Sequence, residues 1–146
     1  MWIAALAAAL DRLTKVLAAR ASDCALIPGL LNLRCVENRG MAFSLLSGRA
    51  ALLSVVTLLI LLGLTAWLVA RPEQGGLLRT GLWLLVGGGL GNLYDRLVFG
   101  QVADFLEFAF VRFAVFNVAD VCVCVGAGLA MLGAILKERR ERNTHG

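Results

Sequence analysis

The sequence is short of charge and lacks the patterns of a soluble or nucleic-acid-binding protein. Charged side chains make up only 16% of its 146 residues, against 60% hydrophobic residues and a mean hydropathy of +0.82. A soluble domain of this size could not bury so much apolar surface, so a soluble fold is excluded. The net charge of +4 comes without a basic stripe carrying interleaved aromatic residues, so we expect no nucleic-acid partner.

Metal-ligand spacings and a typical leader are also missing. The one histidine, His145, lies close to the C-terminus, and none of the four cysteines has the spacing of a metal site. We therefore expect no metal and no cofactor. Cys24 and Cys35 share one loop and would pair only in an oxidising compartment. No basic segment precedes the apolar start, so we expect residues 1–19 to form a retained helix rather than a cleaved signal peptide.

What the sequence does contain is four apolar segments near the length that crosses a bilayer. Only helices or closed barrels satisfy their backbone in lipid, and these segments favour helices. We predict an all-α membrane protein, residues 1–146 forming one domain with four transmembrane helices. The expected spans are residues 1–19, 50–70, 77–98 and 118–136, to within a few residues.

Four spans place both termini on one side of the membrane. The basic stretch Lys137–Arg142 indicates that this side is cytoplasmic, with residues 137–146 as a cytoplasmic tail. All three tryptophans then fall at the inner interface, whereas all seven phenylalanines and Tyr94 fall on the outer side. We therefore expect the outer face to contact lipid or a lipid-like ligand, with Phe105 and Phe108 binding acyl chains.

The predicted outer loops are residues 20–49 and 99–117. In the first, two short apolar runs flank Glu37–Gly40, where Asn and Gly at this spacing favour a tight turn. We predict a small extracytoplasmic hairpin or curled sheet there, although Asn38 and Gly40 could serve only as turn residues. The second loop is predicted to be a short interfacial segment.

Ionisable residues gather near the ends of these spans. Asp11 and Lys15 are four residues apart on the first span and are predicted to form an ion pair. Asn92 and Asp95 share one helix face at the outer end of the third span. Interfacial anchoring, with Arg96 as the counter-charge of Asp95, is one explanation for that pair.

Asp104 and Asp120 are harder to explain structurally, because each lies in an apolar sequence without an adjacent base. Asp120 falls in the first turn of the fourth span, where a capping role is a real alternative. Capping does not explain Asp104. Two carboxyl groups beside one apolar site are what acid–base hydrolysis needs, one ionised to activate water and one protonated to assist the carbonyl.

Five blocks of this sequence together resemble bacterial lipoprotein signal peptidase (signal peptidase II), in order and at similar separations. The blocks are Asp11–Lys15, Asn38–Ser44, Gly91–Arg96, Val102–Phe105 and Phe116–Asp120. The resemblance implies an aspartic endopeptidase of the bacterial cytoplasmic (inner) membrane, with an active site near the outer surface. It would remove the signal peptide of diacylglyceryl-modified prolipoproteins by cutting before the lipidated cysteine.

The resemblance also implies roles for individual residues. Asp104 and Asp120 would be the catalytic pair, and Asp11 and Lys15 would support the site from the first span. The residues implied to line or brace the substrate site are Asn38, Gly40, Asn92, Asp95, Arg96 and Asn117. Arg12 stands where the family usually has Gln, and the stretch between the two aspartates looks compact.

Two other functional classes remain open at this point. A small transporter or proton relay would use intramembrane carboxylates, but it should distribute them through the depth of the spans. Here the aspartates collect at one face. A non-catalytic membrane adaptor is the second alternative, and a cleavage assay separates it from a peptidase. Membrane lipid and the prolipoprotein substrate are the expected partners of a monomeric enzyme.

Overall fold

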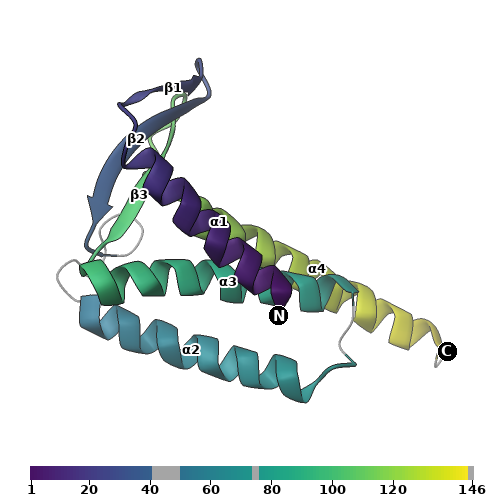
Figure 1. Ribbon diagram of the computed structural model, residues 1–146. Helices are drawn as coiled ribbons and strands as arrows, with labels where there is room; N and C mark the ends of the chain where they lie inside the picture. Colours follow the sequence, from purple (N-terminus) through teal and green to yellow (C-terminus); the bar gives the residue numbers. More distant parts are fainter. Residues whose placement is uncertain (41–49, 74–75, 145–146) are drawn as a thin grey trace.

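The computed structural model describes residues 1–40, 50–73 and 76–144. Within these ranges the chain forms helices that pack around one central helix, with a three-stranded antiparallel sheet at one end (Figure 1). The elements in chain order are α1 (Trp2–Ala18), β1 (Cys24–Ile27), β2 (Leu31–Asn38), α2 (Ala50–Ala70), α3 (Gly76–Phe99), β3 (Val102–Phe108) and α4 (Val118–Thr144).

The helices follow the apolar segments of the sequence closely. Two of them, in the described part of the chain, are long and apolar enough to cross a bilayer: Ala51–Ala70 and Val118–Asn143. α1 is only 17 residues long, and both α1 and α3 carry buried ionisable side chains. The fold is therefore mostly helical with two clear candidate spans, and the four-span arrangement stays a prediction.

Three consecutive glycines make α3 the centre of the bundle. Successive residues of an α-helix point about 100° apart, so neighbours in sequence face different partners. A Cβ at Gly87 would lie 2.6 Å from the carbonyl oxygen of Ala4 in α1, and one at Gly89 would lie 2.7 Å from Leu61 in α2. A Cβ at Gly88 would clash with the carbonyl of Ala119 in α4. The absence of side chains thus lets three helices approach α3 closely, as small residues do in membrane helices.

The close approach of α3 and α4 gives a direct stability test. A Cβ at Gly126 of α4 would lie 2.6 Å from the Gly81 carbonyl oxygen and 2.7 Å from the Leu85 nitrogen. We expect Gly126→Ala to lower the free energy of unfolding by about 1–3 kcal/mol through overpacking. Gly128, two residues away, has no atom within 4 Å of an added Cβ. Gly128→Ala should therefore be neutral or stabilising by up to about 1 kcal/mol. Unfolding in mixed micelles measures both, and equal effects would contradict this packing.

The described part of the chain contains one hairpin, which precedes the predicted one. β1 and β2 are joined through Pro28–Leu30, where Gly29 has a φ of 76° and the Leu30 N–H donates to the Ile27 carbonyl at 3.0 Å. β2 then ends at Asn38. The predicted hairpin around Glu37–Gly40 needs a second strand in residues 41–46, which lie outside the described residues. The prediction of a small sheet is confirmed, and the hairpin at Glu37–Gly40 stays a prediction.

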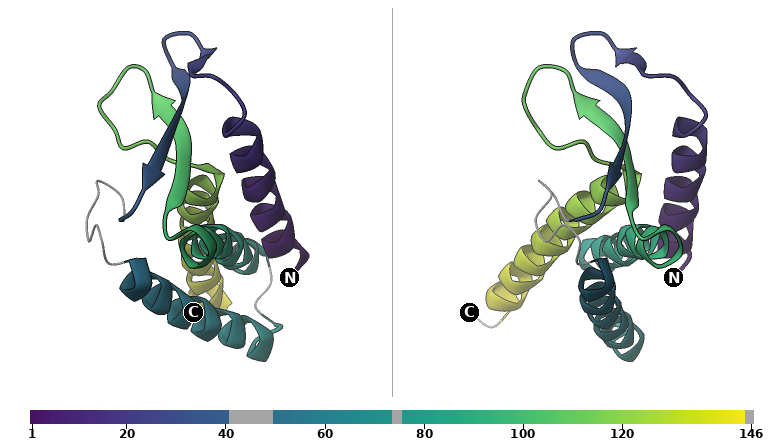
Figure 2. Two further views of the ribbon diagram at one scale, coloured as in Figure 1. Left: turned by 60° about the vertical axis from the view of Figure 1, so that its left-hand side comes forward. Right: turned by 90° about the vertical axis from the view of Figure 1, so that its left-hand side faces the viewer.

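The partner of β2 on its other side is β3, which belongs to the segment predicted to be interfacial. The two strands are antiparallel, with Val36 opposite Asp104 and Asn38 opposite Val102. Period-2 alternation places Val102 and Asp104 on one face of β3. Phe105 packs on the other side, in a buried cluster with Ala18 and Leu33. The sheet stands at one end of the helices (Figure 2), and the register of β3 with β2 fixes the position of Asp104.

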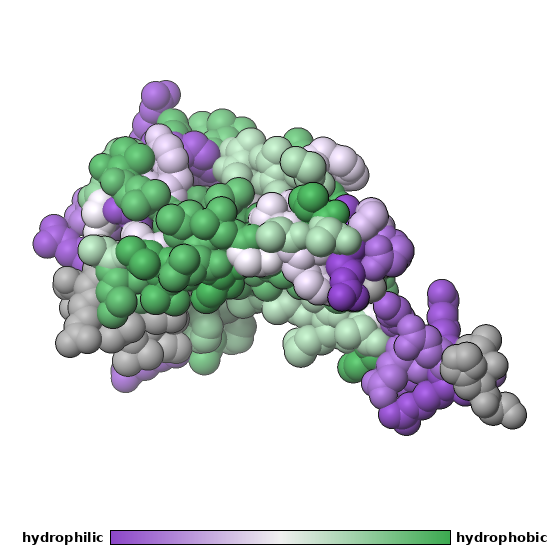
Figure 3. All heavy atoms as spheres, turned by 90° about the horizontal axis from the view of Figure 1, so that it is seen from below, coloured by the Kyte–Doolittle hydropathy of each residue, from purple (hydrophilic) through white to green (hydrophobic). Residues whose placement is uncertain are grey.

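α4 is longer than the predicted span. It continues as a helix to Thr144, so residues 137–144 of the predicted cytoplasmic tail are helical. Glu138 pairs with Arg142 and Lys137 with Glu141, both at the i, i+4 spacing that supports a helix. Figure 3 shows this hydrophilic end standing apart from the apolar surface of the helices.

Candidate active site

Asp104 and Asp120 line one cavity of about 420 Å³ near the end of the helices that carries the sheet. Asp104 comes from β3 and is 3% exposed, whereas Asp120 comes from the first turn of α4. The structure thus brings together two carboxyl groups from elements that are separate in the sequence. Both face the same cavity.

Asn117 connects the two aspartates. Its side-chain Nδ2 donates a hydrogen bond of 2.6 Å to Asp104 Oδ1. Its Oδ1 accepts the Asp120 N–H at 2.9 Å, and its own N–H donates to Asp120 Oδ2 at 3.2 Å. This reciprocal pair is a capping box at the start of α4. The capping contacts considered from the sequence are therefore present, and they leave the other Asp120 oxygen to a different donor.

Two further asparagines supply the remaining donors. Asn92 Nδ2 donates to Asp120 Oδ1 at 2.8 Å, and Asn38 Nδ2 donates to Asp104 Oδ2 at 2.9 Å. Each of the four carboxyl oxygens therefore accepts one hydrogen bond from a neutral amide. Neutral donors hold the carboxyl groups in place without fixing either one as permanently ionised by a direct cation.

The predicted residues Gly40 and Arg96 hold the Asn38 side of the site. The Gly40 N–H donates to Asn38 Oδ1 at 2.9 Å, which turns the Asn38 amide so that its NH₂ group faces Asp104. Arg96 donates to the Gly40 carbonyl at 3.1 Å and to the Asn92 carbonyl at 3.3 Å. Arg96 thus links the end of β2 to α3 and also lines the cavity.

A buried charge cluster lies beneath the asparagines. Lys15 Nζ is 2.8 Å from Asp11 Oδ2, 2.7 Å from Asp95 Oδ2 and 3.1 Å from Asn92 Oδ1. Asp11, Lys15 and Asp95 are each at most 2% exposed, and Asp11 Oδ1 accepts the Ala119 N–H at 2.9 Å. The predicted Asp11–Lys15 ion pair is confirmed. Because Lys15 fixes the Asn92 oxygen, the Asn92 NH₂ group must face Asp120.

The counter-charges of Asp95 differ from the sequence-based alternative. They are Lys15 and, at 3.4 Å, Arg12 Nη1, rather than Arg96. Arg12 also lies over the rings of Tyr94 and Phe99, with its guanidinium carbon 5.3 and 5.1 Å from their centroids. A role for Arg12 near the site could have been inferred from the sequence, because Arg12 directly follows Asp11. Its contacts with Tyr94 and Phe99 depend on how the end of α3 folds.

The pKa of Asp104 differs from that of an ordinary surface carboxyl group. Burial, reinforced by the charge of Asp120, raises the pKa of Asp104 to about 6. Hydrogen bonds from Asn38 and Asn117 act in the opposite direction but do not cancel this effect. A carboxyl group with such a pKa can hold a proton in near-neutral solution, which suits a general acid.

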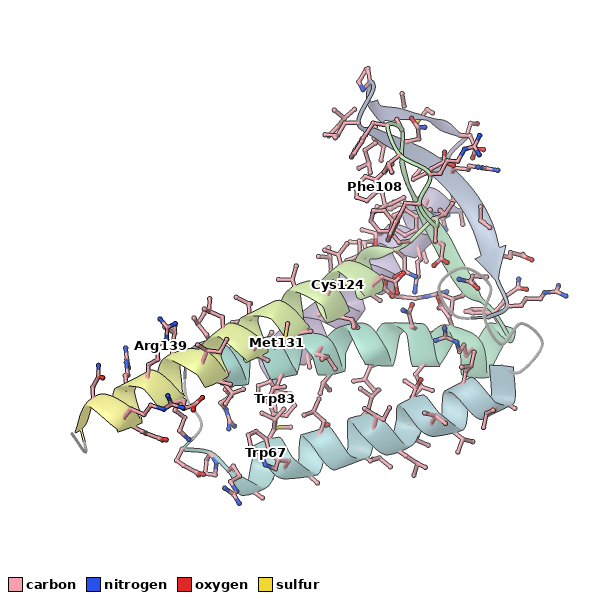
Figure 4. All side chains as sticks on the ribbon, turned by 180° about the vertical axis from the view of Figure 1, so that it is seen from behind. Trp67, Trp83, Phe108, Cys124, Met131 and Arg139 are labelled. Atoms are coloured by element: carbon pink, nitrogen blue, oxygen red, sulfur yellow. The ribbon has the colours of Figure 1, made fainter. Side chains whose placement is uncertain are left out.

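The rest of the cavity wall is apolar. Phe108 packs against Phe113 and Phe116 with tilted rings, whose centroids are 5.9 and 5.0 Å away. Val121 and Cys124 of α4 continue this wall below the aspartates, and Figure 4 shows Phe108 and Cys124 at the sheet end of α4. Phe105 does not line the cavity, so its predicted role toward acyl chains is replaced by its core packing. Cys124 also contributes to the wall.

The two cysteines of the first outer loop do not form a disulfide in this structure. Cys24 and Cys35 are both free and exposed. They lie on the neighbouring strands β1 and β2, where Cys24 is opposite Leu33 rather than Cys35. Neither thiol lies at the cavity.

Comparison with known proteins agrees with this arrangement. Residues 3–136 match the family model described as signal peptidase (SPase) II. A lipoprotein signal peptidase of Gloeobacter violaceus is 42% identical over 95% of this chain and 83% of its own length. One of Desulfitobacterium hafniense is 40% identical over 93% and 92%. A solved bacterial membrane enzyme matches with a TM-score of 0.85 at 29% identity, covering 94% of this chain and 87% of its own. The chain belongs to the signal peptidase II family.

Proposed function

We propose that this protein is an aspartic endopeptidase that removes signal peptides from diacylglyceryl-modified prolipoproteins by cutting before the lipidated cysteine. Its relatives are lipoprotein signal peptidases, which supports a peptidase acting on prolipoproteins. The observation that carries the aspartic mechanism is the shared cavity of Asp104 and Asp120, with one neutral hydrogen-bond donor on every carboxyl oxygen.

In the proposed reaction the two aspartates share one proton. Asp104, whose pKa is raised to about 6, holds that proton, and Asp120 at the start of α4 is assigned as the ionised partner. Asp120 takes a proton from water, whose oxygen attacks the scissile carbonyl, while Asp104 gives its proton to the carbonyl oxygen. Collapse of the tetrahedral intermediate breaks the C–N bond, and Asp120 passes its proton to the leaving amine. Asp104 recovers its proton from the intermediate, so the pair returns to its starting state.

The supporting residues are proposed to keep this pair in position. Asn38, Asn92 and Asn117 orient the carboxyl groups, and Gly40 and Arg96 hold Asn38 and α3 together. Asp11, Lys15 and Asp95 act one layer further away by fixing Asn92. Every one of these residues comes from a single chain, and we propose that the enzyme works as a monomer.

The apolar wall supports a lipid-bearing substrate. Phe108, Phe113 and Phe116 lie on the sheet side of the cavity, and the wall continues along α4 through Val121 and Cys124. A diacylglyceryl group attached to the substrate cysteine has two acyl chains that need such a surface next to the scissile bond. We propose that this wall binds them and thereby sets the cleavage position.

A cleavage assay tests the function directly. Purified protein is incubated with a prolipoprotein carrying the diacylglyceryl group and with the same protein lacking it. We expect cleavage of the lipidated form before its cysteine and at least about a hundredfold lower kcat/KM for the other. Equal cleavage of both forms, or cleavage elsewhere in the chain, would contradict the proposed specificity.

The proposed topology has four spans in the cytoplasmic membrane, both termini in the cytoplasm and the sheet outside. Trp67 lies toward the end of α2 away from the sheet, as expected of an inner interfacial belt (Figure 4). Trp83, predicted for the same belt, is instead buried in the core with Leu68 and Val86. We expect an impermeant maleimide to label Cys24, the exposed cysteine of β1, in intact cells. A single cysteine at Glu73→Cys should react only after permeabilisation. The reverse pattern would invert the topology.

The raised pKa of Asp104 leads to a prediction of how stability changes with pH. Its folded-state pKa of about 6 lies above the usual 3.8, so the folded protein binds more protons than the unfolded chain between these values. The contribution of Asp104 to stability is therefore fully present below pH 3.8 and is lost as the pH rises through 6. We expect Asp104→Asn to remove this component, so Tm of the wild type should fall relative to the variant between pH 4 and 7. Parallel Tm curves over this range would contradict the raised pKa.

A further inference from the structure

A second cavity lies at the opposite end of the molecule from the aspartates, where α3 begins and α4 extends past it. Its volume is about 510 Å³. Its lining combines an apolar part with three ionisable side chains. The lining residues are Glu73, Gly76, Leu77, Leu78, Gly133, Leu136, Lys137 and Arg140. None of them belongs to the site described above.

The shape of this end follows from the packing of two helices. Gly133 of α4 lies against the backbone of Leu78, close to the first residues of α3. α4 then runs 11 residues further to Thr144, about 16 Å at 1.5 Å per residue. Figure 1 shows this part of α4 projecting past the other described helices toward the C-terminus. The cavity is the corner between the start of α3 and this projecting segment.

The helix periodicity sorts the basic residues of α4 into two groups. At about 100° per residue, Gly133, Leu136, Lys137 and Arg140 fall within an arc of about 100° that faces the cavity. Arg139 lies about 100° away from Arg140, and Arg142 lies on the side of the helix opposite Gly133. Arg142 pairs with Glu138, and Lys137 pairs with Glu141 at 3.9 Å. Two cations of α4, Lys137 and Arg140, therefore line the cavity.

The position of these cations matches the edge of a membrane. The apolar run of α4 ends at Leu136, and Lys137 is its first charged residue after Asp120. Leu77, Leu78 and Leu136 form an apolar floor next to a cationic rim. Basic pockets between helices at a membrane surface bind the headgroups of anionic lipids, because the cations reach phosphate while the apolar part contacts the first methylenes of the lipid.

We propose that this cavity binds one anionic phospholipid, a phosphatidylglycerol, with its phosphate on Lys137 and Arg140. The first methylenes of its acyl chains lie on Leu77 and Leu136. Glu73, on the other side of the cavity, accepts hydrogen bonds from the glycerol hydroxyls of the headgroup. The assignment to the cytoplasmic leaflet rests on the topology proposed above, whereas binding itself does not depend on it.

The test measures lipid binding by the purified full-length protein. Dioleoylphosphatidylglycerol or dioleoylphosphatidylcholine is titrated into detergent-purified protein, and the retained lipid is counted by native mass spectrometry. The wild type should retain one phosphatidylglycerol and release phosphatidylcholine at the same concentration. Lys137→Gln/Arg140→Gln should weaken phosphatidylglycerol binding at least about tenfold, because it removes both charge-assisted contacts.

The control has the same loss of charge on the same helix. Arg139→Gln/Arg142→Gln should change the apparent affinity by no more than about twofold, because both side chains face away from the cavity. An equal loss in the control would reduce the effect to general attraction by a basic helix and would overturn the site. Binding of phosphatidylcholine at equal affinity would do the same. Full displacement of the lipid by about 10 mM inorganic phosphate would instead assign a site for a free anion, since phosphate offers no chain for the apolar floor.

Discussion

Asparagine in place of either Asp104 or Asp120 is expected to lower kcat by about 10²–10⁴. Asparagine keeps the size of the side chain and part of its hydrogen bonding, but it cannot exchange a proton with water or with the substrate carbonyl. Because the two residues act as one unit, the double variant should be little slower than either single variant. Single-turnover cleavage of a lipidated prolipoprotein measures the loss, with Tm of each variant recorded alongside.

Glu107→Gln is the matched control for this experiment. Glu107 lies on β3, three residues after Asp104, and it pairs with Arg34 at 2.7 Å. It does not line the cavity of the aspartates. An ion pair this exposed contributes at most about 1 kcal/mol to stability, and its loss should leave kcat within about twofold of the wild type. Near-normal turnover by Asp104→Asn or Asp120→Asn, at unchanged protein yield, would end the proposed mechanism.

Lys15→Met is expected to give the largest loss of stability, lowering the free energy of unfolding by about 3–5 kcal/mol. Methionine matches the apolar stem of lysine but removes the cation that Asp11 and Asp95 share, so that Asp95 keeps only the longer contact with Arg12. Both are almost fully buried, and an uncompensated charge there is costly. Lys15 also holds the Asn92 oxygen, so the variant should lose activity beyond its loss of stability.

Removing a cation from an exposed ion pair shows whether the stability loss of Lys15→Met comes from the buried cluster or from the loss of any cation. Arg34→Met deletes a cation from an exposed pair on the sheet and should cost no more than about 1 kcal/mol. Neutralising the two acids together with the lysine, as Asp11→Asn/Lys15→Met/Asp95→Asn, should restore part of the lost stability because no buried charge remains, Arg12 being half-exposed. Unfolding in mixed micelles gives all three values. A triple variant less stable than Lys15→Met would show that the cluster acts through packing instead.

The helices were the most predictable part of this protein. α2 begins and ends where the uncharged run does, at Ala50 and Ala70, because nothing in that run competes with a helix in lipid. The Asp11–Lys15 pair followed from i, i+4 spacing alone. These features depend on neighbours in the sequence, so one sequence is enough to find them.

The sheet was less predictable because its pairing is not local. The Asn38 side chain accepts the Gly40 N–H, a local contact that the spacing of Asn and Gly favours. The same motif gives no sign that β2 pairs with a strand more than 60 residues later. Phe105 and Phe108 looked equivalent for the same reason, yet one lies in the core and the other on the cavity wall.

The extension of α4 beyond its predicted end has a similar cause. The sequence marks where the apolar run stops, at Leu136, but not where the helix stops. Lys137–Arg142 continues the helix because its acids and bases pair at i, i+4, which the change from apolar to charged composition conceals. Predicting where a transmembrane span ends is therefore different from predicting where its helix ends.

The long-range contacts of the site also determine when this protein can become active during its synthesis. Asn38 reaches Asp104 across 66 positions of the chain, and Asp11 reaches the start of α4 across 108. Asp120 lies on the last helix of the described chain, so a ribosome-bound chain that lacks this helix has only half of the pair. Under the proposed mechanism, such a nascent chain is expected to be inert toward prolipoproteins inserted beside it. We expect cleavage to begin only when α4 has docked on α1.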